Sequence, residues 1–90
     1  SEDQLPQAEK FLDDLLEERP DSPDLQKLMT SYYLAHGKTS TAIAKLDALA
    51  ENLLVGKNIS ASVSVVGQII ALNPPNRQEY EQLYRELNKR

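Results

Sequence analysis

The sequence predicts an all-α domain of about five helices, with residues 1–90 forming a single unit. Four breaks rich in Pro, Gly and Asn, at 20–23, 36–39, 55–58 and 73–76, leave five segments of about 13 to 17 residues, which are lengths typical of helices. Within these segments apolar residues recur three and four positions apart. A chain this short can bury one core only. We expect helices at 4–18, 23–36, 40–54, 59–72 and 77–89.

Composition excludes several classes of site. The chain has no cysteine and one histidine, His36, which rules out disulfides, thiolate metal sites and multi-histidine metal centres. We expect no metal and no cofactor, and no catalytic residue either, because the sequence shows no converging set of titratable groups. The formal charge of −4 argues against a nucleic-acid partner. No stretch approaches the roughly 18 apolar residues of a membrane span, so we expect no membrane insertion.

The first expected helix, 4–18, is acidic on its polar side. Residues 1–25 carry a balance of −7, whereas residues 26–90 carry +3. This asymmetry is most simply a solvated acidic face, and it could also orient a partner or a stacked neighbour. The apolar stripe that should face the core follows helical spacing: Leu5, Ala8, Phe11, Leu12, Leu15 and Leu16.

The second and third helices, 23–36 and 40–54, have clear boundary signals. Ser22 followed by Pro23 is typical of an N-cap with proline at the first helical position. Gly37 and Gly56 are predicted to end the two helices in conformations with positive φ. The apolar stripe of the second helix is Leu25, Leu28, Met29, Tyr32 and Tyr33. The third helix has a broader apolar face, which indicates contact with helices on more than one side: Ala42, Ile43, Leu46, Leu49, Ala50, Leu53 and Leu54.

The segment 59–72 has two interpretations. From Ile59 to Val65 apolar residues alternate with serines, which is a strand pattern, and Gly67 would weaken a helix by roughly 1 kcal/mol relative to Ala. A helical stripe fits the same residues equally well. A lone strand without a partner is not stable, so the helix is favoured, although 59–66 is left open between the two. Asn58 is expected to cap this helix rather than to carry a glycan.

The last helix, 77–89, has Tyr80, Leu83, Tyr84 and Leu87 on one side. Its outer side offers the pairs Glu81–Arg85 and Glu86–Arg90 in the favourable order. Asn76 with Glu79 resembles a capping box.

A repeat of 34 residues superposes Ala8 on Ala42, Leu12 on Leu46 and Leu15 on Leu49. The segment from Leu25 to Ala50 resembles a tetratricopeptide repeat. If Gly37 is the turn glycine, then Met29 and Tyr33 fall on the large apolar and aromatic positions of the first helix. Ala42 then falls on the small position of the second helix, and Pro20 on the terminal proline of the preceding repeat.

The resemblance has departures and an ambiguous register. Gln26 occupies the bulky aromatic position, Thr30 a Gly/Ala position, and Leu54 the expected proline. A second, overlapping match starts from Gly56. The resemblance implies antiparallel helix pairs stacked as a short right-handed α-solenoid, with the charged last helix as its cap.

In this family the first helices of the repeats form a concave binding surface. The resemblance therefore implies a partner-binding face at Asp24, Lys27, Ser31 and Leu34. Lys27 matches the charge of the family's carboxylate clamp, but Ser31 is not the expected asparagine, which puts a clamp in doubt.

These observations favour a non-enzymatic module that binds a peptide or a partner helix. The alternative is a structural or capping segment of a larger helical array, or a self-association domain. A nucleotide-binding loop at Gly37-Lys38-Thr39 is disfavoured, because Tyr32 stands where that loop needs glycine and a helix rather than a strand precedes it. The last helix is the only candidate for DNA contact, and its glutamates disfavour it. The sequence starts without Met, and we expect a piece of a longer protein, with the cytoplasm slightly favoured.

Overall fold

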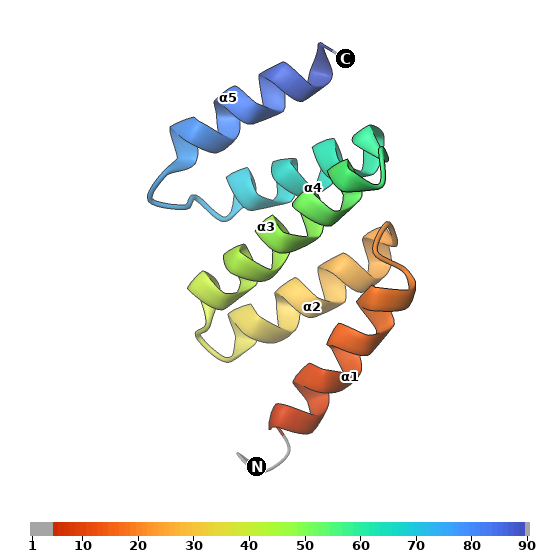
Figure 1. The fold of residues 1–90 in the computed structure, drawn as a ribbon. Coiled ribbons are helices and arrows are strands. Elements are labelled where there is room, and N and C mark those ends of the chain that lie inside the picture. The colour runs from red at the N-terminus through yellow and green to blue at the C-terminus, as the bar shows by residue number, and fades with distance from the viewer. Residues whose placement is uncertain (1–4, 90) are drawn as a thin grey trace.

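The computed structural model describes residues 5–89 and shows five α-helices joined by short connections (Figure 1). They are α1 (Leu5–Glu18), α2 (Pro23–Ala35), α3 (Thr39–Val55), α4 (Ile59–Ala71) and α5 (Arg77–Asn88). No strand occurs among residues 5–89, so the all-helical class is confirmed. The helical interpretation of the segment after Asn58 is confirmed as well, because α4 is an uninterrupted helix with Gly67 inside it.

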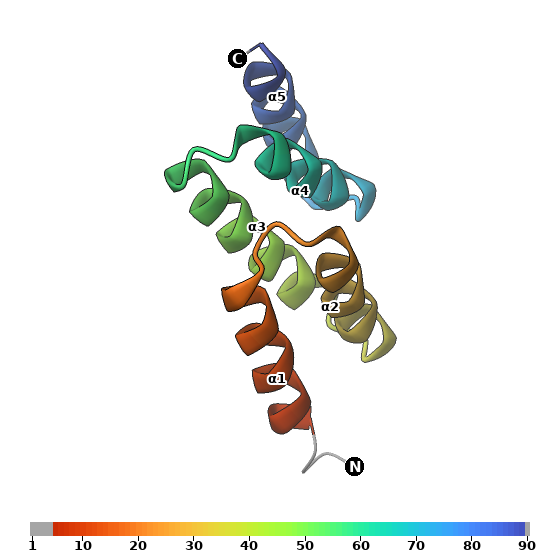
Figure 2. The same ribbon diagram turned by 90° about the vertical axis from the view of Figure 1, so that its right-hand side faces the viewer.

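The helices stack along one axis of a slab that measures 45 × 28 × 17 Å. Consecutive helices run in roughly opposite directions, and the main helix contacts are between neighbours in the chain. Seen from the side, α1 and α3 lie in one layer and α2 and α4 in the other, with α5 across the far end (Figure 2). The two layers pack against each other because the helices bury their apolar faces between them.

The core lies between α2, α3 and α4. Met29 and Tyr33 of α2 meet Ala42 and Leu46 of α3, and all four side chains are almost completely excluded from solvent. Burial of each large apolar side chain stabilises the fold by about 1.5–3 kcal/mol. The broad apolar face of α3 agrees with its position, since α3 packs against helices on both sides and most extensively against α4.

Several stripe residues lie at the surface, contrary to the sequence expectation. Phe11 of α1 is 63% exposed and Leu28 of α2 is 52% exposed. For Phe11 the reason is positional: α1 lies at the end of the stack and has neighbours on one side only, so part of its apolar stripe is left uncovered. Leu83 and Tyr84 of α5, at the other end, are also partly exposed. The side chain of Leu5 lies outside the described residues.

Helix capping agrees with the sequence in α2 and α4. Ser22 Oγ accepts a hydrogen bond from the backbone N–H of Leu25, and Asn58 Oδ1 accepts one from the N–H of Ala61, both at 3.3 Å. Each contact satisfies one of the backbone donors that a helix N-terminus leaves free.

The glycine predictions are half right. Gly37 has φ +70°, as expected, but Gly56 has φ −76° and the left-handed position is taken by Lys57 at φ +63°. The difference arises because α3 continues to Val55, one residue beyond the expected end. The glycine is thereby shifted from the position after the cap to the cap itself.

The start of α5 differs from the predicted capping box. The side-chain amide of Asn76 donates to Glu79 Oε2 at 3.2 Å, and no side-chain bond caps the backbone there. Glu81 pairs with Arg77 at 2.8 Å rather than with Arg85, because Arg77 one turn earlier reaches its carboxylate. The expected Glu86–Arg90 pair lies outside the described residues.

Candidate functional site

The four residues predicted to bind a partner lie on one exposed side of α2. Asp24, Lys27, Ser31 and Leu34 are spaced three, four and three residues apart, which places them on the face opposite the buried side chains of the helix. Leu34 is 41% exposed. The structure therefore brings the four together on one face, and their role in binding stays a prediction.

The rear of α2 is tied to α4 by a buried amide. Gln26 is only 2% exposed, and its Nε2 donates to the backbone carbonyl of Pro20 at 2.9 Å. Its Oε1 accepts a hydrogen bond from Gln68 Nε2 of α4 at 2.8 Å. A buried amide with both ends satisfied fixes the side chain and the two helices that it joins. The face of α2 is thus carried on a rigid support.

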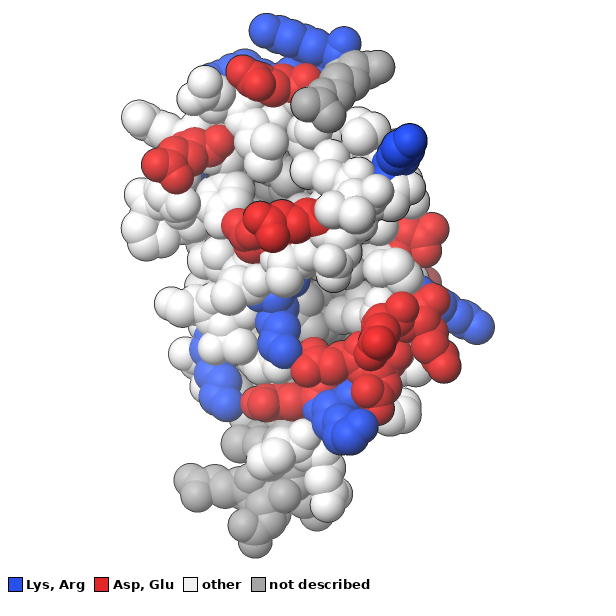
Figure 3. Space-filling view, in the orientation of Figure 1, with Lys and Arg blue, Asp and Glu red and all other residues white. Residues whose placement is uncertain are grey.

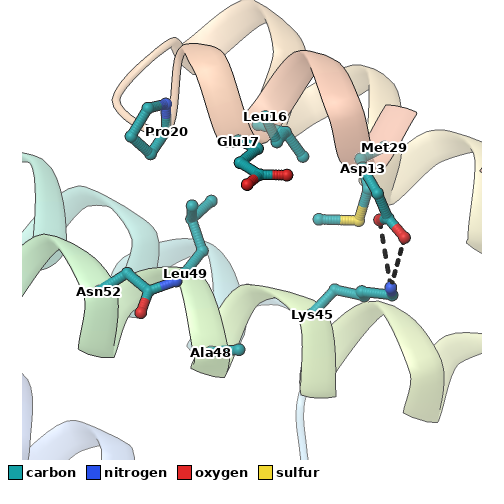
Figure 4. Close-up of a pocket in the computed structure, with 9 residues that line it drawn as sticks. All are labelled: Asp13, Leu16, Glu17, Pro20, Met29, Lys45, Ala48, Leu49 and Asn52. Carbon is teal, nitrogen blue, oxygen red and sulfur yellow. Dashed lines mark hydrogen bonds and ion pairs between the residues drawn. The ribbon is translucent and has the colours of Figure 1, made fainter. Parts of the chain in front are cut away.

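A groove opens between α1 and α3, on the other layer of the molecule (Figure 4). We call it the α1–α3 groove. It has a volume of about 450 Å³. Nine residues line it: Asp13, Leu16, Glu17, Pro20, Met29, Lys45, Ala48, Leu49 and Asn52. Its floor is apolar, since Leu16, Met29 and Leu49 are buried, and its rim is polar.

An ion pair closes one end of the α1–α3 groove. Lys45 Nζ lies 2.9 and 3.1 Å from the two carboxylate oxygens of Asp13 (Figure 4). The hydrogen bond to Asp13 raises the pKa of Lys45 above its ordinary value, although partial burial opposes the shift. A second ion pair, Lys38 with Glu9 at 3.1 Å, joins the first half of α1 to the N-cap of α3, and its hydrogen bond raises the pKa of Lys38.

Negative charge is concentrated around this groove. In Figure 3 the acidic side chains gather at the lower right, over the part of the molecule where Figure 1 places α1. Asp14 is paired with Lys10, but no hydrogen bond or ion pair within residues 5–89 holds the carboxylate of Glu17. That carboxylate reaches into the mouth of the groove (Figure 4).

His36 has a structural role that suits its sequence position. Its Nδ1 lies 2.8 Å from the carbonyl oxygen of Tyr32, so Nδ1 carries the hydrogen and caps the end of α2. The imidazole also packs on the Tyr32 ring, with the ring centroids 4.5 Å apart. Within the described range, no group of three or more His, Cys, Asp or Glu side chains is placed to hold a metal ion.

The helices of the described chain are each too short or too polar to cross a membrane. Comparisons of the chain with protein-family models, with curated protein sequences and with solved structures found no match. The resemblance to tetratricopeptide repeats therefore rests on the residues quoted above.

The α1–α3 groove is the feature that sequence reasoning missed. Its floor residues, Leu16, Met29 and Leu49, are recognisable from the sequence as core residues, but the sequence does not say that α1 and α3 leave a gap above them. The one useful signal in the sequence is the acidic balance of residues 1–25, which indicates the charged rim of the groove but not the groove itself.

Proposed function

We propose that this chain is a protein-interaction module that binds a peptide or a partner helix and performs no catalysis. Its helix pairs would stack as in a short, right-handed tetratricopeptide-like array, with α2 and α4 in the binding layer. The alternation of α1 and α3 with α2 and α4 between two layers supports this arrangement (Figure 2).

The observation that carries the proposal is the number of large apolar side chains at the surface of α1 and α2. Phe11, Leu28 and Leu34 are each more than two-fifths exposed in a small domain. Leu34 lies beside the charged and polar residues Asp24, Lys27 and Ser31, so the α2 face combines an apolar contact with polar groups that set orientation. Exposed apolar surface rimmed by polar residues is typical of protein-binding sites.

The test is affinity capture with the 90-residue chain as bait, comparing three forms. The first is the native chain, the second carries Lys27→Glu and Ser31→Glu on α2, and the third carries Gln82→Glu and Arg85→Glu on α5. Both double variants change the formal charge by the same amount, and all four positions are exposed. We expect a partner that is retained by the native chain and the α5 variant and is lost by the α2 variant. Equal retention by all three would remove the α2 face from the proposal.

The alternative, a capping or self-associating segment, is favoured by the contrast between the two ends of the stack. The exposed side of α5 carries Gln78, Gln82 and Arg85, whereas α1, at the other end, exposes Phe11, and the next helix, α2, exposes Leu28. A second copy or a neighbouring helix could cover that apolar end. Light scattering over a range of concentrations tests it: self-association predicts a rising molar mass that Phe11→Gln with Leu28→Gln abolishes. A constant monomer mass would exclude self-association.

A further inference from the structure

We propose that the α1–α3 groove is a second docking site, which takes a segment of another protein carrying a basic side chain next to an apolar one. The proposal rests on the proposed function insofar as the chain is a binding module. It concerns a different face, since the groove lies between the helices of one layer and the predicted residues lie on α2 of the other layer (Figure 2).

The floor of the groove provides the apolar half of the site. Leu16 comes from α1, Met29 from α2 and Leu49 from α3, so three helices hold the floor in place. Met29 is an unbranched, polarisable side chain that adapts to different apolar partners. Pro20 and Ala48 extend the apolar lining toward the rim, and a volume of about 450 Å³ leaves room for an inserted side chain.

The rim provides the charged half. Three charged residues line the groove, and two of them, Asp13 and Lys45, neutralise each other through the ion pair. Within the described residues, the carboxylate of Glu17 has no partner, and it reaches into the mouth above the apolar floor (Figure 4). The complementary ligand is therefore a cation attached to, or directly beside, an apolar group. The balance of −7 over residues 1–25 attracts such a ligand from a distance.

The shape of the groove favours a protein segment over a small molecule. Small-molecule sites bury about 70–90% of their ligand, whereas this groove is open along its rim, where Glu17, Ala48 and Asn52 are exposed. A trough between two helices is the geometry that receives an amphipathic helix or an extended peptide. Asn52 stands on the α3 side of the rim, opposite α1, where its side-chain amide can bond a peptide backbone (Figure 4).

The experiment uses the 90-residue chain and three fluorescently labelled peptides of about twelve residues, long enough for about three helical turns. The first is built from lysine, with leucines at helical spacing. The second has serine in place of leucine, and the third has glutamate in place of lysine. Fluorescence anisotropy gives the Kd, and amide chemical shifts of the labelled chain show where the peptide lies.

Four variants locate the site. Glu17→Gln removes the charge without changing the shape, and Glu86→Gln, on exposed α5 surface, is its matched control. Ala48→Phe fills the groove, and Ala44→Phe, one turn earlier on the exposed side of α3 and outside the groove lining, is its matched control. The amide spectrum of each variant verifies that it is folded.

We expect the lysine–leucine peptide to bind and the two other peptides to bind at least about tenfold more weakly, because each lacks one half of the required chemistry. Amide shifts should change at 13–20 and 45–52. Glu17→Gln should raise the Kd about threefold, and Ala48→Phe about tenfold, while the two controls stay within about twofold.

Three results would overturn the groove proposal. One is equal binding of the lysine–serine peptide, which would show charge attraction alone. Another is equal weakening by Glu17→Gln and Glu86→Gln. The third is a failure to bind in the groove: the amide shifts change on the α2 face instead, or no peptide binds at all. If affinity capture through α2 succeeds in that case, the proposed function stands without the groove. If the peptide binds in the groove but affinity capture through α2 fails, the groove proposal stands and the α2 face is no longer a binding site.

Discussion

Gln68 on α4 donates a 2.8 Å hydrogen bond from its Nε2 to Oε1 of Gln26 on α2, and Gln26 is almost completely buried. The contact joins two helices that are not neighbours in the chain. Because Gln26 also donates to the carbonyl of Pro20, one side chain fixes the start of α2 and its distance from α4.

The first prediction concerns this network. Gln26→Ala should lower the free energy of unfolding by about 2 kcal/mol, because it removes a buried side chain and leaves the partly buried Gln68 amide and Pro20 carbonyl without that partner. Urea denaturation followed by circular dichroism measures the loss. A double-mutant cycle with Gln68→Ala should give a coupling of about 1 kcal/mol. Strict additivity would show that the amide contact contributes nothing, and Gln78→Ala, at an exposed site, is the control.

The second prediction concerns Tyr80 and pH. Its hydroxyl donates to Asp47 Oδ2 at 2.6 Å. The hydrogen bond to this carboxylate, together with burial, raises the pKa of Tyr80 from 10.0 to about 12. The folded state thus holds the phenol proton more tightly than the unfolded state. The stabilisation is complete below pH 10 and is lost as the pH rises from about 10 to about 12.

Tyr80→Phe should therefore lower the free energy of unfolding by about 1–2 kcal/mol at neutral pH. The difference from the native chain should shrink above pH 10. Absorbance titration of tyrosinate checks the pKa directly, and Asp47→Asn should bring the pKa of Tyr80 back toward its ordinary value. A Tyr80→Phe variant whose stability deficit stayed constant through pH 12 would contradict the assignment. Tyr33, whose pKa burial also raises, is common to both proteins and cancels in the comparison.

The third prediction concerns the two helix-ending turns. Gly37 has φ +70°, so Gly37→Ala should cost about 1 kcal/mol. Gly56 has φ −76°, and an added Cβ would meet backbone oxygens no closer than 3.5 Å, so Gly56→Ala should cost much less. Lys57→Gly should stabilise the fold by about 0.5–1 kcal/mol, since glycine adopts positive φ without the strain of a side chain. Thermal unfolding of the three variants ranks them, and a larger loss at Gly56 than at Gly37 would contradict the turn geometry.

The fourth prediction concerns Gly67 in the middle of α4. A Cβ at this position would lie 3.5 Å from Cε2 of Tyr84, which is an ordinary contact. Gly67→Ala should therefore stabilise the domain by about 0.5–1 kcal/mol, because alanine is the better helix former and no atom must move. Gly67→Leu should instead push against α5 and destabilise. Chemical denaturation measures whether the free energy of unfolding of the alanine variant rises or falls. A fall would mean that α5 packs too closely on Gly67 to tolerate a Cβ atom.

The apolar spacing of the sequence was sufficient to predict the helices but not to decide which residues they cover. α3 was predictable, since its broad stripe from Ala42 to Leu53 can be buried only between other helices. Phe11 has the same spacing and remains at the surface, because coverage depends on the neighbours that an end helix lacks. Gln26 and Ser62 show the reverse: polar residues become core when a specific acceptor lies opposite, as the Ala50 carbonyl does for Ser62.

For the candidate site, the sequence indicated the acidic charge of residues 1–25 and the exposed side of α2, but not the presence of the α1–α3 groove. The spacing of Asp24, Lys27, Ser31 and Leu34 predicted a shared side of α2, which the structure has. The α1–α3 groove depends on how far apart two helices pack, and that distance is set by contacts between residues more than thirty positions apart, such as Asp13 with Lys45. Periodicity within a helix carries no such information.

The position of α1 at the end of the stack has a consequence for local unfolding. Its described side chains include only two that are well buried, Leu12 and Leu16, and its ion pairs to Lys38 and Lys45 are partly exposed and worth little each. We expect α1 to detach at a lower free energy than global unfolding, while α3 and α4 stay folded. Amide hydrogen exchange should then be fastest in α1, and equal protection of α1 and α4 would contradict this view. Each detachment of α1 exposes Met29 and Leu49. The residence time of a ligand bound over these two side chains would therefore be limited by the rate at which α1 detaches.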